Sequence, residues 1–401
     1  MNGPDNGYQG MGTVDIGTLR RHLEATIGWL KEAQDAQHDG GVSAGYTILG
    51  GWRSSYPETT GYIIPTMMNY ATCVGDDSAV PRTIAMAEWL LSVQNIDGSF
   101  PGGAVRQRRG PSVFNTGQIL FGLIRVYHET GCGRFLEAAE KAGRWLTGVQ
   151  ESTGEWRRHD FLGHSHVYNV RTAWALVLLS GVTGESSFRQ AGEANVAWAM
   201  AQADDDGFFH RCAFEPLAKG ERYGLLRSLR AIVRDRSYPS FYTSASLHTI
   251  AYTLQGTLET SWLTGDTYAE SLALKGAARL ASDLSQSHLA GFYGPGWQPM
   301  TRSRCLTGVA QMAVVWLRLW QHGHPEYLPL AEKACSMLVS VQKLGHRIAG
   351  LRGAIAGSDP IWGAYLPFRY PNWAAKFTAD AYLMLLGIKT NRQMLESMTV
   401  W

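Results

Sequence analysis

The sequence predicts an all-α protein in which six helical hairpins close into an (α/α)6 toroid, with six inner helices, six outer helices and a basic helical insertion. Three observations support this prediction. One motif recurs at helix ends, a second set of helices begins with polar residues and continues with apolar ones, and these beginnings recur at intervals of about 55 residues. The alternative architecture is an open superhelix of helical pairs. The chain lacks the polar terminal repeats that an open array needs, which favours closure.

The composition is that of a globular protein with a large core. Of the 401 residues, 45% are hydrophobic, and we expect a single domain over 1–401 with a flexible N-terminus at 1–14. The 36 Lys and Arg against 34 Asp and Glu leave a net charge of +2, so no nucleic-acid partner is expected. Five scattered cysteines without a Cys-x-x-Cys pair, and the absence of a signal peptide pattern, predict a cytoplasmic protein.

The recurring motif predicts the outer helices. It consists of a helix with an inward aromatic residue, a Gln, a turn with Gly, and a second aromatic residue. Two copies lie at 85–100 and 141–156, a looser one at 195–209, and a weaker one at 334–342. Helices of this kind carry a polar stripe, which belongs on the outside of a ring. We expect outer helices at 16–34, 83–94, 135–150, 188–202, 268–286 and 327–342.

The second set of helices predicts the inner barrel. Segments such as 119–126 and 173–179 are apolar nearly all round, as expected of buried helices. We take one marker residue at the beginning of each of these helices. Successive markers are separated by 55, 54, 79, 57 and 67 residues. One hairpin of two helices plus loops accounts for an interval of this size. The markers are Thr60, Asn115, Asn169, His248, Cys305 and Asn372.

The longest interval contains the basic insertion, at 217–237. This segment carries six Lys and Arg against two acidic residues, a local charge of +4, and its apolar residues make it amphipathic. Such a helix suits a lid over the barrel, a protein contact or a peripheral membrane contact. A solvated surface excursion explains the same pattern.

The helix ends resemble a known repeat. Residues 141–146 (Lys-Ala-Gly-Arg-Trp-Leu), followed by Gln150, Gly154 and Trp156, look like the QW repeat of squalene-hopene-type terpene cyclases. A second copy comprises Trp89, Leu90, Gln94, Gly98 and Phe100. The resemblance implies the α/α toroid shared by terpenoid cyclases and protein prenyltransferases, but it does not imply their chemistry.

The catalytic motifs of those two families do not appear. The cyclases use Asp-x-Asp-Asp, whereas the nearest string here, Ala203-Asp204-Asp205-Asp206, lacks the first Asp and suits a turn. The prenyltransferases use zinc ligands of the Asp-x-Cys type, whereas Ser303 stands two residues before Cys305. His164 and His166 could ligate a metal, but no acidic residue or cysteine lies at a supporting spacing, so we expect no metal and no cofactor.

A second resemblance points to sugar chemistry. Residues 56–60 (Tyr-Pro-Glu-Thr-Thr) and 112–117 (Ser-Val-Phe-Asn-Thr-Gly) are similar to the Tyr-Pro-Thr and Ser-Phe-x-x-Asn-Gly region of glucuronyl C5-epimerases. Polysaccharide lyases and several glycosidases are α/α barrels of the same kind. This resemblance implies a carbohydrate-active enzyme.

The predicted substrate site lies where six parallel inner helices present their N-termini at one end of the ring. Helix N-termini favour an anion, such as a uronate carboxylate. Polar residues at these ends include Asn115 and Asn169, which a simple helix cap would also explain. The substrate-binding candidates are Trp52, Tyr62, Asn115, Gln118, Asn169, Arg171, Trp297, Trp362, Arg369, Asn372 and Lys376.

Three residues are the catalytic candidates: Glu58, His248 and Tyr252. His248 and Tyr252 are four residues apart on one helix face, where they suit either a substrate edge or a hydrogen-bonded core pair. A lyase or epimerase needs one such group to remove the C5 proton of a uronate. A glycosidase needs a second carboxylate beside Glu58, for which Asp160 and Asp359 are available.

We therefore expect an enzyme acting on an acidic sugar or polysaccharide, of the uronate epimerase, lyase or glycosidase type. One alternative is a terpenoid cyclase-like or prenyltransferase-like enzyme acting on a polyprenyl diphosphate. The other is a non-catalytic glycan-binding or scaffold protein. In every case the expected partner is an acidic sugar or another anionic small molecule.

Overall fold

The structure is a computed structural model that describes residues 14–107, 109–214, 244–286 and 289–390. The predicted insertion at 217–237 and nearly all of the predicted N-terminal segment 1–14 lie outside these ranges. The described residues form twelve α-helices in two concentric sets. The inner helices are α2 (Pro57–Val74), α4 (Val113–Thr130), α6 (Val170–Thr183), α9 (Leu247–Thr264), α11 (Leu306–Gln321) and α13 (Asn372–Lys389). The outer helices are α1 (Ile16–Asp35), α3 (Ala79–Val93), α5 (Gly133–Gly148), α7 (Ser186–Met200), α10 (Thr267–Gln286) and α12 (Leu328–Val341).

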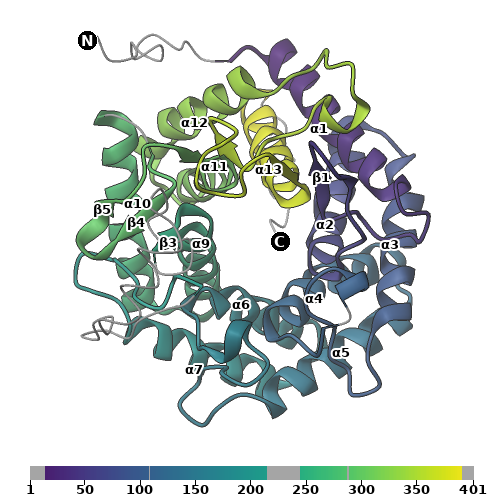
Figure 1. The fold of residues 1–401 in the computed structure, drawn as a ribbon. Coiled ribbons are helices and arrows are strands. Elements are labelled where there is room, and N and C mark those ends of the chain that lie inside the picture. The colour runs from purple at the N-terminus through teal and green to yellow at the C-terminus, as the bar shows by residue number, and fades with distance from the viewer. Residues whose placement is uncertain (1–13, 108, 215–243, 287–288, 391–401) are drawn as a thin grey trace.

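The inner helices close into a ring, as predicted. Each one packs against the next in the chain, and α13 packs against α2. Every outer helix packs on an inner one, and the first helix, α1, packs on the last, α13 (Figure 1). All six predicted inner beginnings fall at the N-terminus of an inner helix. The toroid is therefore confirmed, and the open superhelix is wrong.

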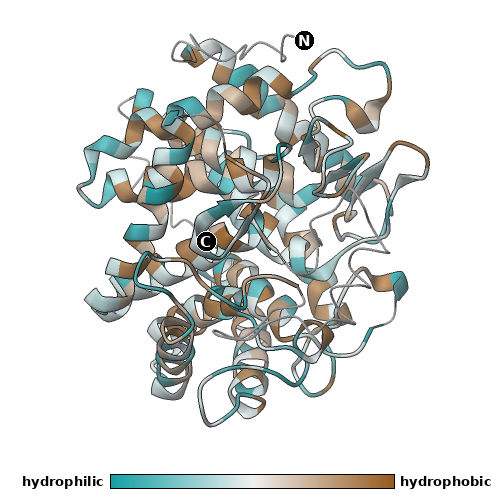
Figure 2. Ribbon diagram, turned by 60° about the vertical axis from the view of Figure 1, so that its left-hand side comes forward, coloured by the Kyte–Doolittle hydropathy of each residue, from teal (hydrophilic) through white to brown (hydrophobic). Residues whose placement is uncertain are grey.

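Close contact between inner helices depends on small residues. A Cβ on Gly61 of α2 would lie 2.6 Å from the Cα of Ile119 in α4, and one on Gly122 would lie 2.3 Å from the Gly61 carbonyl oxygen. No side chain fits there, so these two helices touch backbone to backbone. The inner helices are buried almost throughout, whereas the peripheral helices alternate hydrophilic and hydrophobic residues (Figure 2).

A Gln at the end of α1, α3, α5 and α12 ties each of these outer helices to the next one. Gln94, which ends α3, donates from Nε2 to the carbonyl oxygens of Gly98 (2.9 Å) and of Ala138 in α5 (2.9 Å). Gln150 does the same after α5, to Gly154 (2.7 Å) and to Ala191 in α7 (2.9 Å). The turn glycine is required because Gly98 has a φ of +92° and a Cβ there would lie 2.4 Å from the Lys141 carbonyl oxygen.

Two further copies extend this device around the ring. Gln34, at the end of α1, donates to the carbonyl oxygens of Gly40 (3.2 Å) and of Arg82 in α3 (2.9 Å). Gln342, after α12, donates to the Gly353 carbonyl oxygen (2.7 Å) and to Thr26 Oγ1 in α1 (2.8 Å). The sequence did not reveal the Gln34 copy because its turn is longer and lacks the closing aromatic residue.

Short antiparallel strands organise the loops that precede the inner helices. The strand β1 (Gly45–Thr47) pairs with β2 (Gly51–Trp52) and with β8 (Arg369–Pro371), which joins the loop before α2 to the loop before α13. The other sheets are β3 (Ala245–Ser246) with β4 (Phe292–Gly294) and β5 (Gln298–Pro299), and β6 (Arg304–Cys305) with β7 (Ser358–Asp359). Strands this short leave no periodic pattern in the sequence.

Within the described ranges, no helix is both long and apolar enough to cross a membrane.

Candidate functional site

A cavity of about 570 Å3 opens among the N-terminal ends of the inner helices and the loops that precede them. The helices α2, α4, α9 and α13 contribute residues from their first turns, and the paired strands β1 and β8 form part of the wall. This is the end of the ring that the sequence predicts for the substrate.

A nearly continuous row of rings, which we term the aromatic belt, surrounds the cavity. Its members are Tyr56, Trp373, Tyr365, His248, Tyr252, Phe114 and Tyr168, all of which line the cavity. Neighbouring ring centroids lie 4.3 to 6.3 Å apart, except that Trp373 meets Tyr365 through a hydrogen bond from Nε1 to the phenol oxygen (3.0 Å). Rings at these spacings support one another and form a rigid apolar wall.

Glu58 is the carboxyl at the floor of this cavity. It lies in the first turn of α2 and accepts a hydrogen bond of 2.5 Å from the Tyr56 hydroxyl. Only 8% of the residue is exposed. Burial raises the pKa of Glu58 to about 7, against the opposing effects of the Tyr56 hydrogen bond and the charge of Arg171. A carboxyl with this pKa can both give and take a proton near neutral pH.

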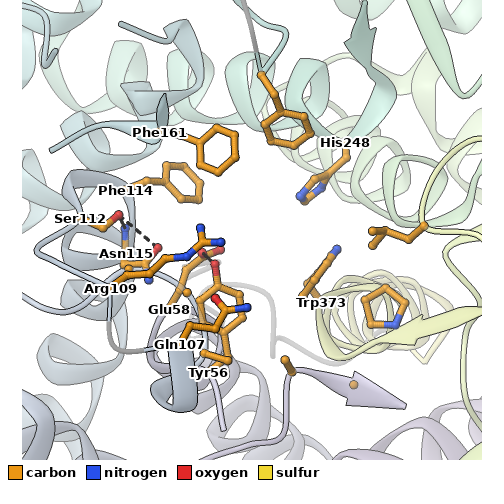
Figure 3. Close-up of a pocket in the computed structure, with 18 of the residues that line it drawn as sticks. Tyr56, Glu58, Gln107, Arg109, Ser112, Phe114, Asn115, Phe161, His248 and Trp373 are labelled. Atoms are coloured by element: carbon orange, nitrogen blue, oxygen red, sulfur yellow. Dashed lines mark hydrogen bonds between the residues drawn. The ribbon is translucent and has the colours of Figure 1, made fainter. Parts of the chain in front are cut away.

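Cationic and amide side chains complete the wall beside Glu58. Arg109 and Gln107 reach into the cavity next to Glu58 and Tyr56, and His248 and Trp373 face them from the opposite side (Figure 3). Arg53 and Arg369 line the cavity as well. Sequence reasoning did not single out Arg53, Gln107 or Arg109. The available signal was the basic run at 106–109, which directly precedes the polar beginning of α4.

The other two catalytic candidates, His248 and Tyr252, lie together on the cavity wall. Their ring centroids are 4.3 Å apart. His248 Nδ1 lies 2.7 Å from Gln311 Oε1, so it carries the ring proton and donates it. Burial lowers the pKa of His248 to about 3, so the ring is neutral, with Nε2 left as an acceptor. The Tyr252 hydroxyl lies 3.5 Å from that of Tyr62, and burial raises the pKa of Tyr252.

The two carboxylates considered as partners for Glu58 are held by other groups. Asp160 lines the cavity, but its oxygens accept four hydrogen bonds, from the backbone of Phe161 (2.7 Å), from the backbone and Nδ1 of His166 (3.2 and 2.9 Å) and from Asn169 Nδ2 (2.6 Å). Asp359 is ion-paired with Arg304 (2.6 Å) and is not part of the cavity lining. Among the described lining residues, Glu58 and Asp160 are the acidic ones.

Two of the predicted substrate-binding residues, Asn115 and Arg369, line the cavity. Asn115 donates from Nδ2 to the Pro101 carbonyl oxygen (2.9 Å), which holds the loop before α4. The predicted tryptophans lie elsewhere. Trp52 packs on Trp29 with centroids 5.1 Å apart, Trp297 donates to the Asp206 carbonyl oxygen (3.3 Å), and Trp362 is 67% exposed.

The remaining candidates are buried, and three of them, Asn372, Arg171 and Tyr62, join one inner helix to another. Their partners are side chains of the protein: Asn169 bonds Asp160 (2.6 Å), Asn372 bonds Thr59 (2.7 Å), Lys376 is ion-paired with Asp380 (2.5 Å), Arg171 bonds Gln118 (2.8 Å), and Tyr62 accepts from Tyr252 (3.5 Å). None of these five predicted residues, nor Gln118, belongs to the lining.

In the described part of the chain, no group of three or more His, Cys, Asp or Glu is arranged to hold a metal.

The loops at the cavity contain strained backbone. His159, Leu162 and Leu366 line the cavity with φ values of +65°, +56° and +51°, and the neighbouring Phe368 has +57°. Residues other than glycine adopt these values at a cost of about 1–3 kcal/mol, and such residues cluster at functional sites. This strain marks the same end of the ring as the aromatic belt and Glu58.

Comparison with known proteins identifies similar structures but no similar sequence. No family model matches the chain, and no curated protein does. An unsaturated glucuronyl hydrolase specific for heparin superposes with a TM-score of 0.72 at 16% identity, covering 94% of this chain and 99% of that chain. The enzyme from Bacillus sp. GL1 gives 0.68 at 13% identity (92% and 96%), and that from Streptococcus agalactiae gives 0.67 at 14% (94% and 94%). The likeness establishes the fold.

Proposed function

We propose that the protein is a carbohydrate-active hydrolase that acts on uronate-containing oligosaccharides, with Glu58 as its acid. One observation carries the proposal: a buried carboxyl with a pKa of about 7 lies in an aromatic-walled cavity beside an arginine. Strongly shifted carboxyls in cavities are typical of acid and base catalysts.

The cavity wall suits a charged sugar. The faces of the aromatic belt can pack on the CH faces of a sugar ring, and amides such as Gln107 can bond its hydroxyls. Arg109 can pair a uronate carboxylate next to Glu58. The similar solved structures are named as unsaturated glucuronyl hydrolases, and one of them is described as complexed with dGlcA-GalNAc6S.

The single available carboxyl favours an unsaturated uronate as the substrate. A glycosidase that cleaves a saturated sugar uses two carboxyl groups, whereas the oxygens of Asp160 are already occupied. The enol ether of an unsaturated uronate needs one acid. Glu58 would protonate C4 of the double bond, and water would add to the resulting cation at C5 and return a proton to Glu58. The C5 hemiketal would then open to a ketone and leave a hemiacetal at C1, whose collapse to an aldehyde breaks the glycosidic bond and releases the second sugar.

A panel of uronate-containing oligosaccharides tests the proposal. Hydrolysis of an unsaturated disaccharide removes the ultraviolet absorbance of its double bond and releases a new reducing end. Glu58→Gln is expected to abolish this reaction, while Glu193→Gln, which changes a solvent-exposed carboxylate in α7, should leave it intact. Full turnover by Glu58→Gln, or binding of every sugar without any turnover by the wild type, would overturn the proposal.

A uronate lyase or epimerase is the second candidate. The observation that favours it is that Tyr252 and Glu58 line the same cavity, because Glu58 in its ionised form could remove the C5 proton. The same panel separates the possibilities. A lyase generates ultraviolet absorbance instead of removing it, and an epimerase exchanges the C5 proton in deuterated water without cleavage.

The polyprenyl diphosphate alternative lacks support at the acidic turn. Asp204 bonds His210 (2.7 Å) and Asp206 accepts from the Phe208 backbone (3.0 Å), so these acids stabilise a turn after α7 outside the cavity lining. Thermal stabilisation by polyprenyl diphosphates alone, without any by uronates, would nevertheless reinstate it.

A further inference from the structure

A buried arginine lies directly behind the wall of the proposed active site. Arg171, in the first turn of α6, has no exposed surface. Its Nε donates to Gln118 Oε1 (2.8 Å) and its Nη1 to Gln255 Oε1 (2.6 Å). Both partners are neutral amides, and Nη2 has no hydrogen-bond partner. Amides therefore fix the guanidinium in place without neutralising it.

Two other cations nearby, the buried Lys376 and the partly buried Arg318, have counterions. Lys376 is paired with Asp380 (2.5 Å), and Arg318 with Glu259 (2.7 Å). Within the ranges that the structure describes, Arg171 takes part in no salt bridge. An unpaired buried charge is costly for stability, so its presence calls for a functional explanation.

Aromatic rings surround the guanidinium and connect it to the cavity. It lies 4.9 Å from the ring centroid of Tyr252, and 5.2, 5.3 and 5.7 Å from those of Phe121, Trp174 and Phe377. Tyr252 is itself one of the residues that line the cavity. One side chain therefore separates this charge from the substrate space, in surroundings with little water to screen it.

We propose that Arg171 is a positioning residue for the reaction proposed above: held behind Tyr252, its buried charge keeps Glu58 able to give up its proton at neutral pH. The inference rests on the proposed function for its role in catalysis, and it assigns Arg171 no contact with substrate. The sequence suggested that Arg171 binds the substrate directly.

The surrounding charges are consistent with this role. The ionisable groups that face this region come from the inner helices and the loops that precede them. They are Tyr56, Glu58 and Tyr62 from α2 and its preceding loop, Arg109 from the loop before α4, Tyr168 from the loop before α6, His248, Tyr252 and Glu259 from α9, Tyr365 from the loop before α13, and Lys376 and Asp380 from α13. From α4 and α11 come the neutral amides Gln118 and Gln311. Burial raises the pKa of Glu58, and the charge of Arg171 lowers it. Without that charge, Glu58 would hold its proton more tightly.

The test is a carbon-13 NMR titration of the glutamate carboxyls, with the Glu58 signal assigned by its loss in Glu58→Gln. Arg171→Met removes the charge but keeps an apolar stem of similar reach, and Arg171→Lys keeps the charge. We expect the pKa of Glu58 to rise in the methionine variant, because the lowering effect of the Arg171 charge is lost. The lysine variant should stay near the wild-type value. Should Arg171→Met fail to fold, Arg171→Gln, which can still bond the two amides, replaces it.

A matched control separates this effect from the loss of any buried arginine. Arg125 is 6% exposed in α4 but is paired with Glu129 (2.7 Å), and Arg125→Met should leave the Glu58 titration unchanged. An unchanged Glu58 titration in a folded, neutral Arg171 variant would overturn the inference.

Because the titration needs no substrate, the two proposals fail separately. Full turnover by Glu58→Gln would refute the proposed function, whatever pKa values the titration yields. If Glu58→Gln is inactive but the pKa of Glu58 is the same in Arg171→Met and the wild type, only the role proposed for Arg171 is refuted. In activity, the alkaline limb of the kcat/KM profile should move to higher pH in Arg171→Met and return in Arg171→Lys.

Discussion

The side-chain amide of Gln342 lies 2.8 Å from Thr26 Oγ1, and 316 residues separate the two in the chain. This contact joins α12 to α1 and closes the outer ring. Because Gln34, Gln94 and Gln150 make the equivalent contacts from α1 to α3, from α3 to α5 and from α5 to α7, closure uses the same interaction as these three junctions.

Loss of the closing amide should destabilise the protein. Gln342→Ala removes the bonds to Thr26 and to the Gly353 carbonyl oxygen, leaving buried partners unsatisfied, so we expect the free energy of unfolding to fall by about 1–3 kcal/mol. Urea unfolding measures this. Gln286→Ala, at an exposed position in α10, should change it by less than about 0.5 kcal/mol. Equal effects of the two variants would contradict the role given to Gln342.

Glu58 should stabilise the fold at low pH rather than high pH. Its pKa rises from 4.5 in the unfolded chain to about 7 in the folded protein, so its contribution is fully present below pH 4.5 and is lost as the pH rises through 7. The shift corresponds to about 3 kcal/mol. Glu58→Gln should therefore gain stability relative to the wild type between pH 5 and pH 8, as measured by urea unfolding at both values. If the difference in free energy of unfolding between variant and wild type does not vary with pH, the pKa of the Glu58 carboxyl is not raised by folding.

His248 should have the opposite pH dependence. Because burial lowers its pKa from 6.5 to about 3, its contribution to stability is present above pH 6.5 and is lost as the pH falls toward 3. His248→Asn, which does not titrate, should make the protein less sensitive to acid across this window. The midpoint of urea unfolding, followed from pH 7 to pH 4, checks this, and parallel curves for variant and wild type would contradict it.

Arg109 should set the preference for acidic sugars. If it pairs a uronate carboxylate, Arg109→Gln loses a charge-assisted bond of about 1.5–3 kcal/mol, which raises KM roughly 10- to 100-fold. The same variant should lose little affinity for a methyl-esterified substrate. Arg157→Gln is the control, since Arg157 is exposed and does not line the cavity. Equal losses for the charged and esterified sugars would show that Arg109 serves another purpose.

The helices could be predicted from the sequence because their signals are local. A polar first turn followed by apolar residues marks an inner helix, and Gln before a glycine turn marks the end of an outer one, as at Gln94 and Gln150. Glu58 and His248 were found for the same reason, since they lie in the first turns of inner helices.

Most loop residues of the site could not be predicted in this way. Arg53 follows β2 and reaches the cavity beside the pairing of β1 with β8, which joins segments more than 300 residues apart in the chain. Arg369, in β8, is the predicted loop residue that does line the cavity. Trp297 and Trp362 show the reverse error. Aromatic residues in loops suggest a binding wall, but only the three-dimensional path of each loop decides which rings face the cavity.

The pairing of α13 with α1 has a consequence for chain connectivity. These two helices pack as an inner and outer pair, just as α4 and α5 do, although α1 and α13 are the first and last described helices whereas Gly131 and Cys132 link α4 directly to α5. The packing of an inner helix on its outer partner therefore does not require a short turn between them. A circular permutant with a linker from α13 to α1, and a new opening between α4 and α5, should assemble the same barrel, because both helix pairs keep their contacts.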